Sequence, residues 1–503
     1  MLAQKLILSY ATKIVLQVFQ IGASIVVARV AGPTVLGTVA FGLAYVSMFQ
    51  FVSELGLGNA HIKLVSEGND LGKCISTYAR LKFFTTCLYV IVTISIFLSQ
   101  KYAFNTSFES QTHEYVILIF LVMVTSQSFL TIPNVTFAAK TEQAKQDVPE
   151  FLRNIFLQIS RIIAVLLGYR ALTLAFCNLT SALIVVPLVL FLFRGYPFGG
   201  YDAALAKRYI KLAIPLIFIA VSATLVRTLD KVLLQFFSSS EQVGYYAAGY
   251  RIGNFILIIA TSVGMLFFPL FSQAASRKNY EYIKATIEKF ERFSFLFIMP
   301  AVIFFAIYSD TIVLTILGET YIPSIGVLSL ISVAMFIMVL NMPYGNVLTG
   351  LGLFFLSAKI SLANVVFFSS ALFVLIHPDF LGLNAIGAAY GILASNIMLG
   401  VLFRIFAKQK LSNLDVKGGF RYLIFGLINF GAFFLLYAKG KNEWGMIFLI
   451  IFPLLYFALT FLILIMLGWI KKQDWQMLMS LFNLRAMKKY IDSEISFTKM
   501  SKS

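Results

Sequence analysis

The segment RTLDKVLLQFF, residues 227–237, places three ionisable side chains within about one turn of an otherwise apolar run: Arg227, Asp230 and Lys231. Inside a membrane, charged side chains are costly, and they generally face the interior of a helix bundle or a water-filled cavity. Asp230 follows Arg227 by three residues, a spacing at which two helical side chains can pair. Because such a pair leaves Lys231 over, we expect an excess of positive charge in the space that this segment faces.

Polar side chains recur at helical spacing on two separate apolar runs. One stripe consists of Lys13, Gln17, Gln20 and Ser24, and the other of Thr224, Arg227, Lys231 and Gln235. Steps of three and four residues place the members of each stripe on one face of a helix. A shift of 207 residues lays Gln20 on Arg227 and Ser24 on Lys231. We therefore interpret the two stripes as equivalent positions of an internal repeat.

The same shift aligns a glycine-bearing motif. VLGTVAFG at 35–42 and QVGYYAAG at 242–249 share three residues, at the pairs Gly37/Gly244, Ala40/Ala247 and Gly42/Gly249. A shift of 210 residues aligns Pro133 with Pro343 and Asn154 with Asn364. Internal repeats of this kind are typical of membrane transporters. We predict that the first six helices and the next six are two parallel copies.

Other apolar runs carry further candidate residues. Arg161 and Arg251 each continue a polar stripe on their own run. Few acids are available to neutralise them, and within the apolar runs only Glu54 and Asp230 are well placed. Arg29 lies at the outer end of the first run, where reaching out to lipid headgroups is an alternative explanation.

A cavity with unbalanced cations requires an anion, and arginine suits phosphate because its planar fork donates parallel hydrogen bonds. We hypothesise that Arg227, Lys231 and Arg251 help to bind an anionic, phosphate-bearing substrate in the outer half of a central cavity. The full candidate binding set is Lys13, Gln17, Gln20, Arg29, Arg161, Arg227, Lys231 and Arg251. For its neutral members, hydrogen bonding between helices, worth about 0.6 kcal/mol per contact, explains the pattern equally well.

The composition describes the elements that must position these residues. Apolar residues make up 59% of the 503-residue chain and charged residues only 12%, whereas soluble domains carry about 25% charged residues. Apolar runs close to the ~20 residues that span a bilayer recur along the whole chain. The sequence thus predicts an all-α polytopic membrane protein with about fourteen transmembrane helices, the first over 7–29 and the last over 444–469.

The net charge of +18 is distributed by topology. Lysine and arginine cluster after every second predicted helix, whereas opposite connections such as SSSEQV and HPDFLGLN contain none. Because basic residues favour cytoplasmic loops, we expect both termini in the cytoplasm and no nucleic-acid surface. The first apolar run is too long and too rich in Gln and Ser for a cleaved signal peptide. Two amphipathic segments, 277–293 and the basic tail within 471–503, are predicted to lie on the membrane surface.

Catalytic and metal chemistry find little support in the sequence. Three scattered cysteines and three isolated histidines offer neither a disulfide framework nor metal-ligand spacing. A P-loop is missing, so ATP is not expected as a direct energy source. We expect no enzyme activity and no cofactor, and an ion gradient of protons or sodium is the expected form of coupling.

Two segments carry a family resemblance. ARVAGPTVLGTVAFGLAYVSMFQFVSELGLGNAHIK, 28–63, resembles the opening motif of the polysaccharide transporter family, and LDKVLLQFFSSSEQVGYYAAGYRI, 229–252, is similar to its second signature. That family belongs to the multidrug/oligosaccharidyl-lipid/polysaccharide exporter superfamily. The resemblance implies two six-helix lobes, here 1–200 and 201–411, followed by two additional helices in 412–470 and the tail.

The resemblance also implies an activity. Members flip an undecaprenyl-diphosphate-linked oligosaccharide, for example an O-antigen repeat unit of lipopolysaccharide, across the bacterial inner membrane by alternating access. Asp230 matches the signature aspartate of the seventh helix, and Glu54 stands where relatives often carry Asp. Both are expected to serve in coupling or charge pairing. The implied partners are the lipid-linked oligosaccharide, membrane lipids and polysaccharide assembly proteins.

Two alternatives stay open. A multidrug or cation antiporter of the same superfamily would favour acids in its cavity, since its substrates are cationic. A membrane polysaccharide polymerase or ligase would carry a large outer loop with catalytic residues. Within the flippase interpretation, a peptidoglycan or teichuronic acid precursor also stays open as cargo.

Overall fold

The computed structural model describes residues 2–102, 108–257, 260, 280–410, 417–443 and 445–469. Within these ranges every regular element is a helix and no strand occurs. Eight of the described helices are long and apolar enough to cross a membrane, or nine if the bent helix α9 counts as one span. The prediction of a multi-pass helical membrane protein is confirmed. The number fourteen is not confirmed, since helix α1 covers two predicted spans and the span predicted over 244–271 is described only at 244–257 and 260.

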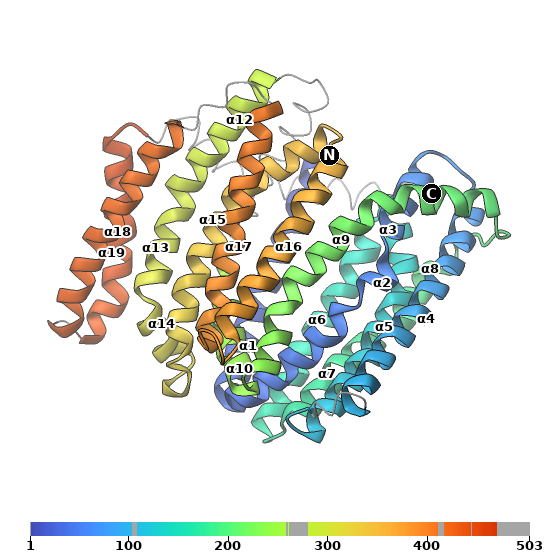
Figure 1. Cartoon of the computed structure of the whole chain (residues 1–503), viewed down its shortest axis with the longest axis horizontal. Helices are drawn as coiled ribbons and strands as arrows, with labels where there is room; N and C mark the ends of the chain where they lie inside the picture. The colour runs from blue at the N-terminus through green and yellow to red at the C-terminus, as the bar shows by residue number, and fades with distance from the viewer. Residues whose placement is uncertain are drawn as a thin grey trace, which may run out of the picture.

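Helices α1 to α8 form the N-terminal half of the molecule (Figure 1). Their bounds are α1 Leu2–Met48, α2 Phe51–Glu54, α3 Leu57–Ser66, α4 Leu71–Tyr102, α5 Gln111–Ala139, α6 Gln143–Leu166, α7 Ala171–Ile184 and α8 Val186–Phe193. The C-terminal half contains α9 Ala203–Phe237, α10 Ser240–Gly253, α12 Tyr280–Phe293, α13 Met299–Ile307, α14 Ser309–Ile316, α15 Ser324–Gly350, α16 Phe354–Ile376 and α17 Asn384–Lys410. Helices α18 Lys417–Glu443 and α19 Gly445–Met466 lie at the edge beside α13.

Helix α1 is broken at Gly32. This residue has φ 81° and ψ 170° and is followed by Pro33. Glycine accepts a positive φ without a steric penalty, and proline disfavours a helical residue before it. The Gly-Pro pair of the sequence motif is therefore the point at which the first predicted span ends and the second begins.

The second part of α1 crosses α10 with backbone against backbone. A Cβ atom on Gly37 would lie 1.7 Å from the carbonyl oxygen of Ser240, and one on Gly244 would lie 1.9 Å from that of Pro33. These two glycines are the pair that the internal repeat aligns. Since neither position has room for a side chain, the repeated glycines allow the two halves to approach at this end of the molecule, the lower end in Figure 1.

Helix α9 connects the two halves and is bent by 53° between Ala203–Ile214 and Leu216–Phe237. Its first part packs on the N-terminal half, where Tyr209 is fully buried and its hydroxyl lies 2.7 Å from Nδ1 of His61. Its second part lies against α16 and α1. The first part of α9 lies beyond residue 201 in the sequence but packs on the N-terminal half. The domain boundary at 200/201 therefore remains a prediction.

The two amphipathic segments have different outcomes. Helix α12 continues through a π-helical turn, Ser294–Ile298, into α13, and its apolar residues Ile283, Ile287 and Phe290 are buried within the protein. It is thus not a separate helix on the membrane surface, because the same amphipathic pattern can pack against neighbouring helices. The tail 471–503 lies outside the described residues.

Candidate functional site: a cationic cavity between the two halves

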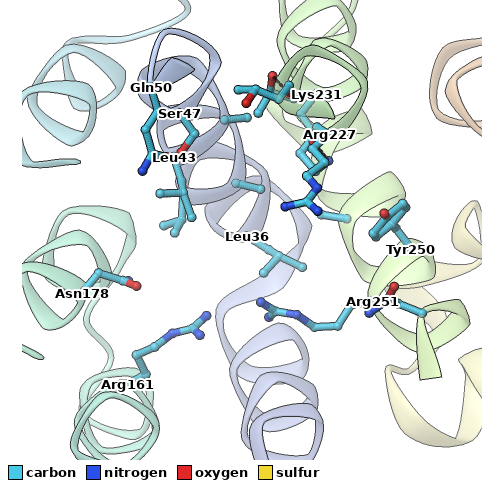
Figure 2. A pocket seen from close by; sticks show the side chains of 17 residues that line it. Leu36, Leu43, Ser47, Gln50, Arg161, Asn178, Arg227, Lys231, Tyr250 and Arg251 are labelled. Carbon is cyan, nitrogen blue, oxygen red and sulfur yellow. Dashed lines mark hydrogen bonds between the residues drawn. The ribbon is translucent and has the colours of Figure 1, made fainter. Parts of the chain in front are cut away.

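A cavity of about 510 Å³ lies between the two halves (Figure 2). Its walls come from the second part of α1, from α6 and α7, and from α9 and α10. Leu36, Leu43 and Ala44 of α1 form an apolar surface, which Ser47 of α1 and Gln50 in the turn before α2 continue as a polar one. The cavity is therefore bounded by both halves of the molecule.

Among the described residues, four cations and no acidic residue line this cavity. Arg161 comes from the N-terminal half, whereas Arg227, Lys231 and Arg251 come from the C-terminal half. Arg161 and Arg251 point toward one another from opposite sides, and Arg227 reaches into the same space (Figure 2). The structure brings together the four cations that sequence reasoning placed on three different helices.

The three arginines lack an acidic partner within the part of the chain that the structure describes. Arg161 is 95% buried, and its Nε has no hydrogen-bond partner there. Arg227 and Arg251 are exposed to the cavity. A buried guanidinium without partners is costly, so this arrangement favours an anion that accepts hydrogen bonds from both halves.

Asp230 pairs with Lys231, whereas the spacing in the sequence had suggested Arg227 as its partner. Its carboxylate oxygens each lie 3.0 Å from the Lys231 Nζ, and Oδ2 accepts a hydrogen bond of 2.5 Å from the hydroxyl of Tyr246. The lysine stem folds back, so that Nζ also donates to the carbonyl of Arg227 at 3.1 Å and lies over the ring of Tyr250 at 5.0 Å. Arg227 is consequently left to extend into the cavity.

Glu54 pairs within the N-terminal half. Its Oε1 lies 2.9 Å from Nζ of Lys82, a fully buried lysine of α4 that also donates to the Ser53 carbonyl. Helix α2 ends directly after Glu54, where Leu55 and Gly56 both have positive φ. Charge pairing of Glu54 is thus observed, and a role in coupling stays a prediction.

Two other predicted binding residues, Gln20 and Arg29, are not among the described residues that line the cavity. Gln20 donates to Oδ1 of Asn154 at 2.7 Å and so joins α1 to α6. Arg29 is exposed and donates to the carbonyl of Thr315 at 3.1 Å. The side chains of Lys13 and Gln17 lie outside the described residues.

Sequence reasoning missed two polar lining residues and one important acid. Asn178 and Thr228 line the cavity, but neither extends a long polar stripe. Glu109, in the connection before α5, contacts Gln235 and Ser240 of the other half. A lone acid in a short connection has no periodicity, so nothing in the pattern distinguished it from a solvated loop residue.

The arrangement is similar to solved transporter structures. The lipid II flippase MurJ in an inward closed conformation matches with a TM-score of 0.70 and 14% identity, over 91% of this chain and 97% of that one. An inward-facing multidrug resistance transporter of the MATE family matches with a TM-score of 0.62 and 14% identity, over 79% and 95%. A transporter from Pyrococcus furiosus Vc1, described by the reverse polarity of its binding pocket, matches with a TM-score of 0.56 and 13% identity, over 82% and 96%.

These likenesses define the class: the fold is that of transporters of the multidrug/oligosaccharidyl-lipid/polysaccharide exporter superfamily. The family model of polysaccharide biosynthesis proteins matches residues 26–326, more than half of the chain. The chain belongs to this family. No curated protein sequence matches it.

Proposed function

We propose that this protein translocates an undecaprenyl-diphosphate-linked oligosaccharide, an O-antigen repeat unit or a related polysaccharide precursor, across the bacterial inner membrane by alternating access. The observation that carries the proposal is the cavity whose described lining residues include four cations and no acid. Membership of the polysaccharide biosynthesis family and likeness to a lipid II flippase support it.

The diphosphate would lie between Arg161 and Arg251. In this position it accepts hydrogen bonds from both halves at once, and its charge relieves the repulsion between two facing guanidinium groups. Arg227 supplies a third guanidinium group that can donate paired hydrogen bonds. Lys231, already held by Asp230, contributes positive electrostatic potential. The oligosaccharide would occupy the polar side of the cavity near Ser47, Gln50 and Asn178.

The proposal includes orientation and coupling. Both termini lie in the cytoplasm, membrane lipids surround the helices, and polysaccharide assembly proteins use the product. A proton or sodium gradient drives the change between conformations. Asp230 serves as a positioning residue for Lys231 in this scheme.

Multidrug antiport is the competing function, since a MATE transporter shares the fold. A cationic drug would be repelled by four positive side chains unless acids compensated them. The sign of the cavity charge therefore favours an anionic substrate.

The test replaces cavity arginines in a bacterial strain that lacks its own transporter of this class. Arg227→Gln and Arg251→Gln should each reduce the appearance of lipid-linked repeat units on the outer leaflet at least about tenfold, because each removes charge-assisted hydrogen bonds. Arg208→Gln is the matched control on the same helix, since Arg208 pairs with Glu67 at 2.8 Å outside the cavity.

Membrane expression of all variants is measured alongside transport. Undiminished transport by both cavity variants, with normal expression, would overturn the proposed function. Loss of transport by Arg208→Gln to the same degree would also contradict it, because the effect would then not depend on the cavity.

A further inference from the structure

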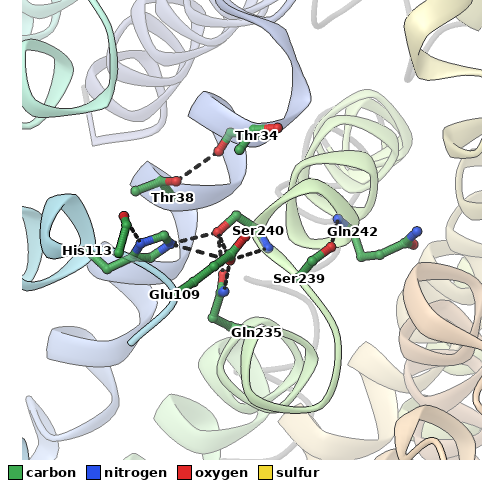
Figure 3. Close-up of polar contacts among 9 residues, drawn as sticks. Thr34, Thr38, Glu109, His113, Gln235, Ser239, Ser240 and Gln242 are labelled. Carbon is green, nitrogen blue, oxygen red and sulfur yellow. Dashed lines mark hydrogen bonds and ion pairs between the residues drawn. The ribbon is translucent and has the colours of Figure 1, made fainter. Parts of the chain in front are cut away.

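A second polar cluster lies at the end of the molecule where α1 crosses α10 (Figure 3). Glu109 and His113 contribute from the N-terminal half, and Gln235 and Ser240 from the C-terminal half. Gln235 belongs to the polar stripe of α9, but it lies one turn beyond Lys231 and outside the cavity. The cluster is therefore separate from the substrate site.

One carboxylate oxygen accepts every hydrogen bond that joins Glu109 to the other half. Its Oε2 accepts from the backbone N–H of Ser240 at 2.9 Å, from the Ser240 hydroxyl at 2.5 Å and from Nε2 of Gln235 at 2.6 Å. Charge-assisted hydrogen bonds of this kind are the strong ones. Their geometry requires the two halves to be in contact.

His113 completes the cluster. Its Nε2 lies 2.6 Å from the Ser240 hydroxyl and 3.8 Å from Oε2 of Glu109, and its Nδ1 lies 2.9 Å from the hydroxyl of Ser110. The single hydroxyl proton of Ser240 already faces two oxygen acceptors, Oε2 of Glu109 at 2.5 Å and Oε1 of Gln235 at 3.1 Å, so the imidazole donates to the hydroxyl through Nε2. His113 thus orients Ser240 toward the carboxylate.

Aromatic side chains pack beside the hydrogen bonds between Glu109 and Ser240, and Glu109 is also accessible to water. Phe41 packs against Phe236 edge to face at 5.9 Å and against His113 at 5.8 Å. The Glu109 side chain itself is 43% exposed, so protons and water reach it. Loss of its charge would leave the buried Ser240 and Gln235 with a weaker acceptor.

We propose that Glu109 is a latch that holds the two halves together at the α1–α10 end, and that removing its charge favours the conformation open at this end. The latch acts on the equilibrium between conformations and not on substrate recognition. It therefore goes beyond the proposed function and does not depend on the identity of the cargo.

The physical cause of the Glu109 pKa fixes the direction in which pH shifts the equilibrium between the two conformations. Burial alone would raise the pKa of this carboxyl, but the hydrogen bonds from Ser240 and Gln235 outweigh it and hold the pKa below the usual value. Separation of the halves removes these donors and returns the pKa toward about 4.3. The closed end is thus favoured above that value and lost as the pH falls through the lower pKa of the latched state.

The charged and titratable groups around the latch are few. His113 is the titratable group that approaches Glu109 within 4 Å among the described residues. Helix α9 and the first residue of α10 contribute the uncharged Gln235 and Ser240. Glu241, next on α10, accepts from the hydroxyl of Tyr245 at 2.6 Å.

The test measures the separation of the halves directly in the full-length protein. Spin labels are placed at Tyr169→Cys and Phe380→Cys, two exposed positions in the connections α6–α7 and α16–α17. The background lacks Cys74, Cys87 and Cys177. Pulsed electron paramagnetic resonance in lipid nanodiscs then gives the ratio of long to short distances.

Glu109→Gln should raise the ratio of long to short distances about tenfold near neutral pH, since it removes the charge that three donors share. The wild type should show the same shift only when the pH falls from about 7.5 to well below about 4.3, through the lowered pKa of the latched state, and Glu109→Gln should show no further shift. Glu114→Gln is the matched control, because Glu114 lies on α5 and pairs with Lys101 at 2.6 Å within the N-terminal half.

A second variant tests the latch independently, in case Glu109→Gln does not fold. Gln235→Ala removes one donor from the opposite half, so it should shift the ratio in the same direction by less and keep the pH response. Unchanged distances in both Glu109→Gln and Gln235→Ala, or an equal shift in Glu114→Gln, would overturn the latch. Transport loss in the cavity arginine variants is scored separately, so each proposal can fail alone.

Discussion

At the scale of single residues, the cavity separates cations with a partner from cations without one. Lys231 is compensated by Asp230, whose carboxylate is 99% buried and also accepts from Tyr246. Arg227, one turn earlier, has no acidic partner among the described residues. Removal of these two positive charges should therefore have different consequences for stability.

Lys231→Met should lower the thermal midpoint of the purified protein, because it leaves Asp230 buried without its cation at a cost of about 3–5 kcal/mol. Arg227→Met should leave the midpoint unchanged or raise it, since it removes an uncompensated charge. Thermal unfolding in the same detergent compares the two variants with the wild type. An equal loss of stability in both variants would contradict the distinction.

At the scale of elements, the break in α1 and the crossing with α10 decide how closely the halves approach. The crossing places the backbone of each helix against a glycine of the other. Glycine in a helix is less favourable than alanine by about 1 kcal/mol. Its presence at Gly37 and Gly244 is explained by the contact and not by the helix itself.

Gly37→Ala should force the crossing apart, because a Cβ at this position would lie 1.7 Å from the Ser240 carbonyl. We expect a loss of about 1–3 kcal/mol, as for other overpacked contacts, together with a longer distance between the two spin labels. Gly22→Ala is the control on the same helix, since nothing lies within 4 Å of its added Cβ. A stable Gly37→Ala protein with wild-type distances would show that the crossing is not tight.

At the scale of the whole molecule, the cavity places positively charged side chains of the two halves opposite one another. Arg161 and Arg251 come from opposite halves, and the repulsion between their charges opposes close approach unless an anion binds between them, as the proposed function requires. An anion that binds only this folded arrangement stabilises it by mass action.

Inorganic diphosphate should therefore raise the thermal midpoint of the wild-type protein, whereas sodium chloride at equal ionic strength should not. At a concentration of 100 times its dissociation constant, the stabilisation is about 2.7 kcal/mol. Arg161→Gln should lose most of this shift, because one half no longer contributes a fork. A full shift in Arg161→Gln would place the anion elsewhere.

Much of the architecture follows from the sequence because its causes are local. Long apolar runs predict helices that cross a membrane, and a fixed shift of 207 residues identifies the repeat and its paired glycines. Helical spacing also places Arg227, Lys231 and Arg251 on polar stripes. The sequence by itself thus determined the class of the protein, the sign of its cavity charge and most of the residues that carry it.

The tertiary structure decided which of these residues meet. The packing of the two halves places Arg161 opposite Arg251 across the cavity, and a lysine stem that folds back gives Asp230 its partner. Glu109 became visible as a latch only through Ser240 and Gln235, more than a hundred residues away. Periodicity describes the face of a single helix, whereas contacts between halves depend on how bent helices are placed in space.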